Sequence, residues 1–182
     1  MKQQPKQFLL LLVALVVLVG GYYGLRAYNK SSEEKAEQEA MQQMGETMIA
    51  AEVEEIVGCS YDYNGGIYTY EKENDTWYYA EDHSLNLQQS MITGMLEKFA
   101  PLVSRQKIDN VMDYAQYGLE EPSKTVTICT EKEEYTVYVG DYNSITAASY
   151  FRMGGDDAVY VTTAAINGSF NKTVEELIQE AE

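Results

Sequence analysis

An uncharged apolar run near the amino terminus constrains this chain more than any other sequence feature. Phe8 to Leu25 forms 18 consecutive positions, rich in leucine and valine, without a charged residue. At ~1.5 Å per residue, a helix of this length reaches ~27 Å, close to the thickness of a hydrocarbon core. We therefore predict a single N-terminal transmembrane helix and assign residues 1–30 to a membrane anchor with its flanks.

A cleaved secretory signal is the alternative interpretation of this run. Such a signal has a shorter apolar stretch followed by a small-x-small cleavage site, which only residues 19–21 approximate. Tyr22, Tyr23 and Tyr28 instead match the aromatic belt found where a span meets the membrane interface. The sequence thus favours an uncleaved anchor.

The charge distribution predicts which side of the membrane the rest of the chain occupies. Residues 1–30 carry a charge of +4, because they contain Lys2, Lys6, Arg26 and Lys30 and no acid. Residues 31–182 carry −20, which gives the chain its net charge of −16. The amino terminus and two lysines precede the span, and Arg26 and Lys30 follow it, so the small positive excess ahead of the span favours a cytoplasmic N-terminus. We therefore expect a single-pass protein of the cell membrane with an extracytoplasmic C-terminal domain. The acidic exterior also argues against nucleic acid as a partner, because it repels phosphates.

Residues 31–51 are predicted to form a charged helical stalk. Their glutamates, glutamines, alanines and methionines are helix formers, but they provide no wide apolar face. A thin stripe at Ala36, Ala40, Met44 and Met48 leaves open pairing with a partner helix. Gly45 is the expected end of this helix.

Alternating apolar and polar residues replace the helical pattern from residue 52 onward. Cys59 to Tyr63, Ile67 to Lys72 and Thr76 to Tyr79 are predicted strands, joined by turns at residues 64–66 and 73–75. Asn64-Gly65-Gly66 supplies the positive-φ residues that a tight hairpin needs. These strands form a predicted meander.

Helical spacing returns at residues 87–102. Leu87, Met91, Met95 and Phe99 recur every four residues, so we expect an amphipathic helix of about three turns, capped by Asn86. Pro101 is expected to end it. A second short helix is predicted from Asn110 to a left-handed C-cap at Gly118.

A second set of strands follows this helical region. We predict strands at residues 125–130, 134–140, 150–153 and 158–162, and then helical segments with a capping box at Thr173 and Glu176. The extracytoplasmic domain, residues 52–182, is therefore expected to be an α+β fold of antiparallel β-meanders with helices. A duplicated βββα unit, with repeats at 52–108 and 122–182, would explain the recurrence.

The chain resembles the domain-of-unknown-function 4340 (DUF4340) family of bacterial membrane-anchored proteins. The resemblance rests mainly on the tryptophan strand at residues 76–78 and on the Tyr-Gly-Leu-x-x-Pro corner at residues 117–122. Further matches are the apolar span and residues 61–65, 138–141 and 159–161. The resemblance implies an N-terminal span, an exported domain and an accessory role in an envelope or transporter-like complex. It implies no catalytic residues.

The sequence contains few residues of the types that usually form catalytic or metal sites. His83 is the one histidine, and it lies in a polar loop, so we expect a surface residue rather than a ligand or base. We expect no enzyme activity, no cofactor and no metal. Cys59 and Cys129 each lie late in the first strand of a unit, so a disulfide is possible if those strands pair; two buried, reduced thiols are the alternative.

The aromatic residues of the first meander give the one positive indication of a binding surface. Tyr68, Tyr70, Trp77 and Tyr78 would stack on sugar rings or bind a strand if they were exposed, whereas buried rings would be ordinary packing. We expect a non-catalytic binding or scaffolding module that contacts an unidentified envelope protein. A module that binds cell-wall glycan or peptide through this sheet is the alternative, and an uncharacterised enzyme is the second alternative.

Overall fold

The structure, a computed structural model, describes residues 45–179. The predicted anchor and residues 31–44 of the predicted stalk lie outside the described residues. Among residues 45–179, no helix is both long enough and apolar enough to cross a membrane.

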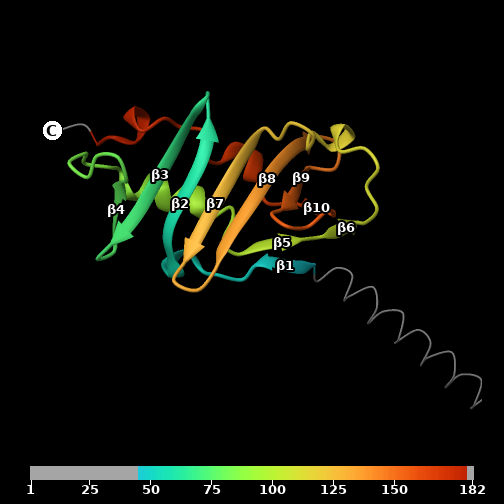
Figure 1. Ribbon diagram of the computed structural model, residues 1–182, viewed down its shortest axis with the longest axis horizontal. Coiled ribbons are helices and arrows are strands. Elements are labelled where there is room, and N and C mark those ends of the chain that lie inside the picture. Colours follow the sequence, from blue (N-terminus) through green and yellow to red (C-terminus); the bar gives the residue numbers. More distant parts are fainter. Residues whose placement is uncertain (1–44, 180–182) are drawn as a thin grey trace, which may run out of the picture. The chain divides into compact units, whose positions relative to one another are not determined.

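Eight antiparallel strands form one curved sheet (Figure 1). Their order across the sheet is β4–β3–β2–β7–β8–β9–β10–β6. The strands are β2 (Ile56–Tyr63), β3 (Gly66–Glu73), β4 (Thr76–Tyr79), β6 (Gln106–Ile108), β7 (Lys124–Thr130), β8 (Glu134–Asn143), β9 (Ala148–Met153) and β10 (Val159–Thr162). The domain is therefore mostly antiparallel sheet, in agreement with the predicted meanders.

Two tight turns join the first three strands of this sheet. Asn64 and Gly65 adopt φ values of 50° and 78°, and Asn74 and Asp75 adopt 47° and 62°. Two consecutive positive φ values define a type I′ turn, whose twist matches that of an antiparallel hairpin. Local sequence thus sets the positions of both predicted turns.

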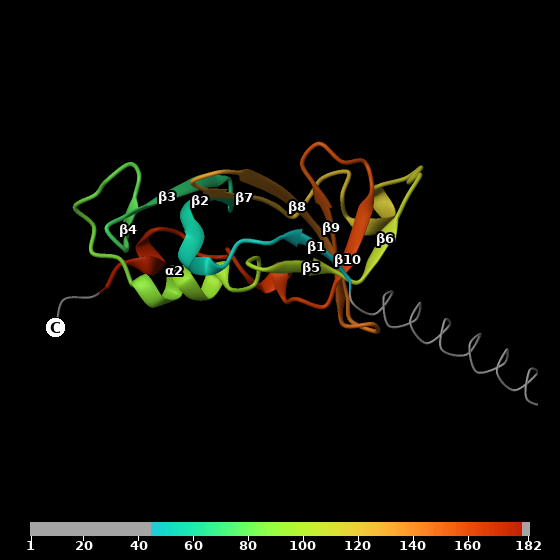
Figure 2. The ribbon, with the colours of Figure 1, turned by 90° about the horizontal axis from the view of Figure 1, so that it is seen from below.

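A second layer lies against one face of the sheet (Figure 2). It contains the helix α2 (Gln89–Leu96) and a two-stranded sheet of β1 (Glu46–Ile49) and β5 (Leu102–Ser104). Short 3₁₀ segments complete the described chain: η1 (Val53–Glu55), η2 (Ala115–Tyr117), η3 (Ile166–Gly168) and η4 (Glu175–Leu177). We call the sheet face toward α2 the inner face and the opposite one the outer face.

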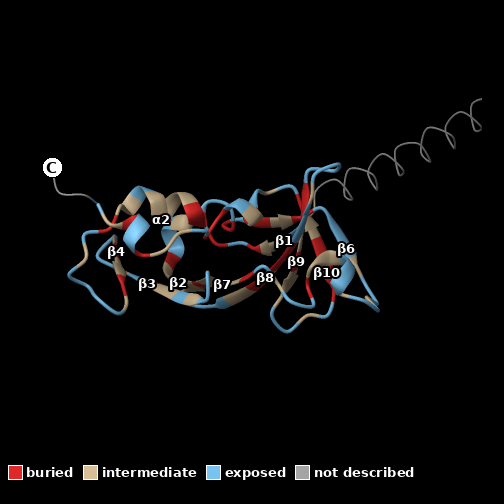
Figure 3. Ribbon diagram, turned by 90° about the horizontal axis from the view of Figure 1, so that it is seen from above, coloured by how far each residue is buried: buried red, intermediate tan, exposed pale blue. Residues whose placement is uncertain are grey.

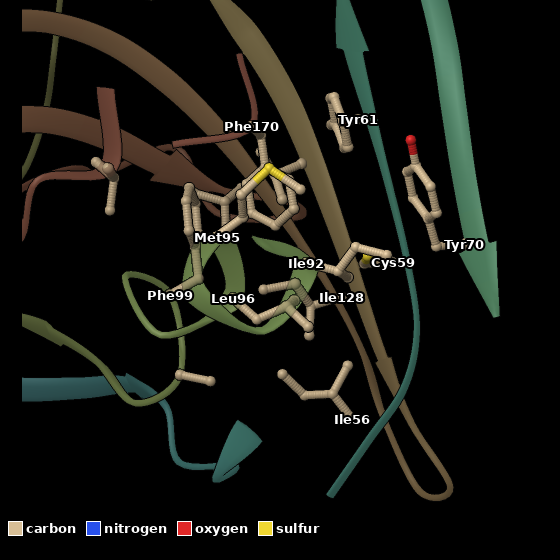
Figure 4. Packing of buried hydrophobic residues seen from close by; sticks show 14 of the residues in the cluster. Ile56, Cys59, Tyr61, Tyr70, Ile92, Met95, Leu96, Phe99, Ile128 and Phe170 are labelled. Atoms are coloured by element: carbon tan, nitrogen blue, oxygen red, sulfur yellow. The ribbon is translucent and has the colours of Figure 1, made fainter. Parts of the chain in front are cut away.

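The hydrophobic core fills the space between these two layers (Figures 3 and 4). Ile92 and Leu96 of α2 are fully buried in one cluster with Cys59 and Ile128 of the sheet. Burial of a large apolar side chain contributes about 1.5–3 kcal/mol, so this cluster dominates the stabilisation of the domain. Phe99 extends it, with its ring centroid 5.2 Å from that of a second aromatic residue, Phe170.

The folded domain begins earlier in the chain than the sequence predicts. Residues 46–49 form β1, which pairs with β5, and Ile49 is fully buried. The predicted stalk over 31–51 is therefore wrong for these residues, because strand pairing and burial override their helical composition. Gly45, with a φ of 49°, marks the start of the described domain.

The helix α2 is shorter than the predicted three turns. Leu87 forms an isolated bridge with Ile178, and the Gln88 amide donates to the Leu177 carbonyl over 2.8 Å. This long-range pairing holds residues 86–88 extended, so Asn86 does not cap the helix. The buried residues that follow, among them Ile92 and Met95, still form the predicted apolar face.

The two predicted units meet at their first strands but differ in composition. The order β4–β3–β2 is mirrored by β9–β8–β7 about the antiparallel β2–β7 pair. Residues 122–179, however, contain the additional strand β10 and the 3₁₀ segments η3 and η4, with no α-helix. The second unit is therefore not a βββα unit within the described residues.

Candidate binding surfaces

Most of the predicted aromatic surface is turned into the core. Tyr70 is paired with Cys59 and is fully buried, and Trp77 retains 4% exposure. Tyr68 is also on the inner face and is half-buried, with its ring centroid 5.5 Å from that of Tyr61. The prediction that Tyr70 and Trp77 contribute to a binding surface is therefore wrong, because both lie on the side that the second layer covers.

The inner-face tyrosines form a packed aromatic row. The ring centroid of Tyr70 lies 6.0 Å from that of Tyr61 and 5.6 Å from that of Tyr79. The Tyr61 hydroxyl donates to the Lys172 carbonyl over 2.9 Å. Burial raises the pKa of Tyr70 to about 12 and also raises the pKa of Tyr61. These rings stabilise the fold and are not available to a ligand.

Tyr78 is the member of the predicted surface that lies on the outer face. It is paired with Glu71 in β3, and it is half-buried. Its ring stacks on His83, with centroids 5.1 Å apart and planes at 18°. His83 is exposed in its loop, as predicted, and its described ring contact is packing.

The two cysteines lie on adjacent strands but on opposite faces. Cys59 is paired with Ile128, and Cys129 is paired with Gly58, in the β2–β7 ladder. Neighbouring residues along a strand alternate between faces, so Cys59 points into the core while Cys129 points outward. Both are free thiols. The strands pair as the disulfide hypothesis requires, but their register directs the two sulfur atoms apart.

One edge of the large sheet is closed by a side chain. The Gln89 amide accepts from the Trp77 backbone N–H over 2.7 Å and donates to the Trp77 carbonyl over 3.0 Å. These two bonds replace those that a further strand would make to the middle of β4. Strand addition at this edge would first have to displace Gln89.

Small hydroxyl side chains cover the middle of the outer face. Ser60 lies opposite Thr69 on one neighbouring strand and opposite Thr127 on the other, and Thr127 lies opposite Thr136. In Figure 2, no described element lies over this part of the sheet. The outer face of β3, β2, β7 and β8 is therefore open, and its middle is polar.

Charge on the outer face of β2, β3 and β7, and at the start of β8, has a single sign. The acids there are Asp62, Glu71, Glu73 and Glu134. The lysines of these strands, Lys72 and Lys124, belong to the inner side. These strands therefore carry carboxylates and no cation on their outer side, and the cation of the neighbouring strand β9 on this face is Arg152.

Both lysines are held by partners on the inner side. The Lys72 ammonium donates to the Glu54 carbonyl over 3.0 Å and pairs with Asp75 at 3.6 Å. The Lys124 ammonium is buried, and it donates to the Asn167 and Ser169 carbonyls. Burial lowers the pKa of Lys124. These contacts keep the lysines from neutralising the outer face.

Further acids surround the sheet end formed by the β7–β8 turn. A cavity of about 400 Å³ lies there between this turn and the chain that precedes β2. Its lining residues are Ala50, Ala51, Glu55, Thr130, Glu131, Lys132, Glu133 and Tyr135. Lys132 is the cation of this lining. The acidic character of the outer face thus continues around the end of the sheet.

The Tyr-Gly-Leu-x-x-Pro corner packs tightly on β8. Gly118 adopts the predicted left-handed conformation, with a φ of 66°. A Cβ atom at Gly140 would lie 2.2 Å from the Tyr117 carbonyl oxygen, so only glycine permits this close approach. The Asn167 side chain donates to the Gly140 carbonyl over 2.6 Å. The corner is therefore fixed to the sheet at one residue.

These features define an antiparallel α+β domain with an open acidic sheet face. The family model described as domain of unknown function (DUF4340) matches residues 77–181. The chain belongs to this family, which confirms the resemblance noted in its sequence. No curated protein and no solved structure matches the chain.

The family match begins within β4 and covers α2 and the Tyr-Gly-Leu-x-x-Pro corner. The acidic outer face was missed by the sequence reasoning, although Glu71-Lys72-Glu73 carries a signal for it. In a strand, the two glutamates share one face and the lysine takes the other. The Gln89 contact to β4 had no comparable signal, since it depends on tertiary packing.

Proposed function

We propose that this chain is a non-catalytic, membrane-anchored, extracytoplasmic binding module that docks a cationic surface of another envelope protein. The observation that carries the proposal is the open outer face, where Glu71 and Glu134 lie in one row across four strands. Gly58 and Cys129 lie between them in the same row, and their small size leaves space between the two carboxylates. A basic segment laid across this row would meet acids on both sides.

Charge supports a protein partner with lysine or arginine at its contact surface. Opposite potentials steer association and select partners, and they do so more strongly at low salt. Glu71, Glu73 and Glu134 are exposed, so each of their ion pairs would contribute only modestly, about 0–1 kcal/mol. Affinity would then depend on several such pairs acting together with the hydroxyl side chains in the middle of the outer face.

Anchoring and location form the second part of the proposal. The apolar run Phe8–Leu25 would span the membrane with the N-terminus in the cytoplasm, and the domain that begins at Gly45 would lie outside. Lys2 and Lys6 ahead of the run support this orientation. A module of this kind would serve as an accessory part of an envelope or transporter-like complex.

The strand order supports an origin by duplication. We propose that β2–β3–β4 and β7–β8–β9 descend from one three-stranded meander, because their mirrored order places equivalent first strands side by side. The second copy then ends in β10 and 3₁₀ segments, where the first has α2. The central acidic row would in that case lie across the junction of the two copies.

Glycan or peptide binding through the tyrosines has lost much of its support. Of the four aromatic residues that would form such a surface, Tyr70 and Trp77 are buried. Tyr68 lies on the inner face, so only Tyr78 remains on the outer side, stacked on His83. A single half-buried ring offers too little area for a stacking platform, so docking of a cationic protein surface is the better hypothesis.

In-cell photocrosslinking tests the docking proposal. A photoreactive residue at Thr127, in the middle of the outer face, should crosslink one specific envelope protein. The same residue at Lys98, an exposed position in the layer opposite, is the matched control and should give little of that product. Crosslinks only to bulk cell-wall material, or equal yields at both positions, would count against the proposal.

Charge variants connect this crosslink to the acidic row. The double substitution Glu71→Gln and Glu134→Gln should reduce the Thr127 crosslink by about two- to ten-fold, as expected for loss of two exposed pairs. Glu97→Gln, an exposed acid after α2, removes charge outside the row and should leave the yield unchanged. Equal effects of the two changes would contradict a specific role for the row.

A further inference from the structure

A single arginine of the sheet lies between two tyrosine rings on the outer side of β9. The guanidinium carbon of Arg152 lies 4.7 Å from the ring centroid of Tyr138 and 5.5 Å from that of Tyr114. Tyr138 is the direct cross-strand neighbour of Arg152 on β8. Contact with two aromatic rings limits the motion of the side chain and keeps its planar donor array oriented.

Arg152 has no carboxylate partner among residues 45–179, although the domain is strongly acidic. Two lysines of the domain do form ion pairs, Lys72 with Asp75 and Lys107 with Asp109. The Nε atom of Arg152 is buried and has no hydrogen-bond partner. A buried donor without a partner costs about 1–3 kcal/mol, and this arginine is not positioned by hydrogen bonds of its Nε within the domain.

Arg152 lines a cavity of about 360 Å³ on this side of the sheet. The other lining residues are Met112, Asp113, Tyr114, Leu119 and Glu120. Two of these walls are fixed by hydrogen bonds: the Tyr114 hydroxyl donates to the Asp157 carbonyl over 2.6 Å, and Asp113 Oδ1 accepts from the Ala115 amide over 2.9 Å. The site is thus held in shape without a ligand.

The Tyr-Gly-Leu-x-x-Pro corner supplies the remaining wall. Leu119 is buried and follows the left-handed Gly118, and Glu120 is exposed directly after it. The close approach of Tyr117 to Gly140 fixes where this wall stands. The sequence motif that identified the family therefore shapes the cavity beside Arg152.

We propose that this cavity binds the carboxylate of an amino acid or short peptide, with Arg152 as the carboxylate receptor. A guanidinium presents donors in a fork that matches a carboxylate with two parallel hydrogen bonds. Glu120 lines the same cavity, so its carboxylate would receive the ammonium group of such a zwitterion. The binding site is separate from the acidic row and does not depend on the docking proposal.

Charge discriminates against the other anion that arginine commonly binds. Inorganic phosphate carries up to two negative charges near neutral pH, and Asp113 and Glu120 would repel it from the cavity. A zwitterion has no net charge and meets both signs. Acetate, which has the carboxylate but no ammonium group, should bind more weakly than an amino acid.

Nitrogen-15 arginine labelling of the full-length chain provides the direct test. Arg152 Nε–H has its own resonance, and Arg26 and Arg105 serve as internal references. Titration with L-alanine or glycylglycine should shift the Arg152 resonance and leave the references in place, with acetate and phosphate giving weaker responses. L-Alanine and glycylglycine distinguish a free amino acid from a peptide as the preferred source of the carboxylate.

Matched variants separate the roles of the two charged groups. Arg152→Gln should weaken L-alanine binding by roughly ten-fold or more, as expected for loss of a charge-assisted bidentate pair. Glu120→Gln should reduce L-alanine affinity to about that of acetate, while Lys98→Gln, which removes a cation far from the cavity in sequence and on another element, should have no effect.

Three results would overturn the proposal. They are an unshifted Arg152 resonance at saturating concentrations of all four probes, tighter binding of phosphate than of L-alanine, and unchanged L-alanine affinity in a folded Arg152→Gln variant. The resonance test uses the unsubstituted chain, so it stands even if a variant fails to fold.

Discussion

At the residue scale, short hydrogen bonds fix the ionisation of individual side chains in the β9–β10 turn. The Tyr160 hydroxyl donates to Asp156 Oδ2 over 2.5 Å, and the Ala158 amide donates to Asp156 Oδ1 over 2.8 Å. The Tyr160 bond, followed by the Ala158 bond, holds the pKa of Asp156 below its ordinary value. Burial, with Asp156 beside it, raises the pKa of Tyr160 to about 12.

This pair predicts a specific acid sensitivity. A carboxyl whose pKa is lowered by folding stabilises the native state fully above its unfolded pKa, near 3.8, and loses that contribution as pH falls through its folded pKa. The unfolding free energy that separates the natural chain from Asp156→Asn should therefore shrink as pH falls below about 3.8. Urea unfolding midpoints measured across this range provide the check.

Asp157→Asn is the control for that prediction. Asp157 is the exposed neighbour of Asp156, and its backbone carbonyl, which substitution retains, is the acceptor for Tyr114. The difference between this variant and the natural chain should vary much less with pH. An equal pH dependence of both variants would refute a specific role for Asp156.

At the element scale, the corner at residues 117–122 and the strand β8 form one tightly packed joint. The Leu119 side chain and the Tyr117 carbonyl lie directly over Gly140. Asn167 of η3 binds the carbonyl of the same glycine from another direction. Two separate segments of the chain thus converge on a single position of β8 that carries no side chain.

Substitution of Gly140 by alanine should displace the corner at residues 117–122 from β8 and destabilise the domain. In Gly140→Ala the new Cβ would lie 2.2 Å from the Tyr117 oxygen, so the corner must shift, at a cost of about 1–3 kcal/mol in unfolding free energy. Chemical denaturation of the full-length chain measures this loss.

Gly94→Ala is the matched control for Gly140→Ala. A Cβ atom at Gly94, inside α2, would meet no atom within 4 Å, so alanine should stabilise the helix by about 0.5–1 kcal/mol. A Gly140→Ala variant as stable as Gly94→Ala would show that the corner does not pack as described.

The elements also show what sequence can predict and what it cannot. Asn64-Gly65 and Gly118 were predicted correctly, because the conformation of each depends on its own residues. The start of α2 and the strand β1 were not, because Leu87 pairs with Ile178 and β1 pairs with β5 across long stretches of chain. Local propensity has no information on such partners.

For the candidate surfaces, too, the sequence predicts local features but not long-range contacts. Side-chain alternation along a strand places Tyr68 and Tyr70 on one side of β3, but it does not tell which side the second layer covers. The burial of Tyr70 and the exposure of Glu71 could therefore be assigned only from the structure. The stacking of Arg152 on Tyr114 joins residues 38 positions apart, and no spacing pattern indicates it.

At the scale of the whole molecule, buried tyrosines make the stability of the fold depend on pH in the alkaline range. Tyr70 and Tyr160 have pKa values of about 12, against an ordinary value of 10.0, chiefly because burial disfavours the charged form. A group whose pKa is raised by folding stabilises the native state fully below its unfolded pKa and loses this contribution as pH rises through the folded value. Stability should therefore fall between pH 10 and about pH 12.

Two signals followed together test this behaviour. Tyrosinate absorbance should show a late, cooperative component that coincides with loss of the circular dichroism of the sheet. If all tyrosines instead ionise in one smooth step near pH 10 while the sheet remains intact, the buried aromatic row is not formed as described.

The whole chain also combines an apolar N-terminal run, a strongly acidic remainder and a folded domain with an open sheet face. Every part of the proposed function depends on that domain lying outside the cytoplasm. Ile145, in the β8–β9 turn, is 94% exposed and offers a position for a reporter thiol. Cys59 is buried, and Cys129→Ser removes the thiol of the outer face, so a cysteine introduced at Ile145 would be the one reactive site among the described residues.

Labelling of an Ile145→Cys, Cys129→Ser chain with a membrane-impermeant maleimide is the most direct measurement. If the domain lies outside the cytoplasm, intact spheroplasts should label this cysteine as fully as lysed ones do. Labelling that occurs only after lysis would place the domain in the cytoplasm and contradict the proposed role in the envelope.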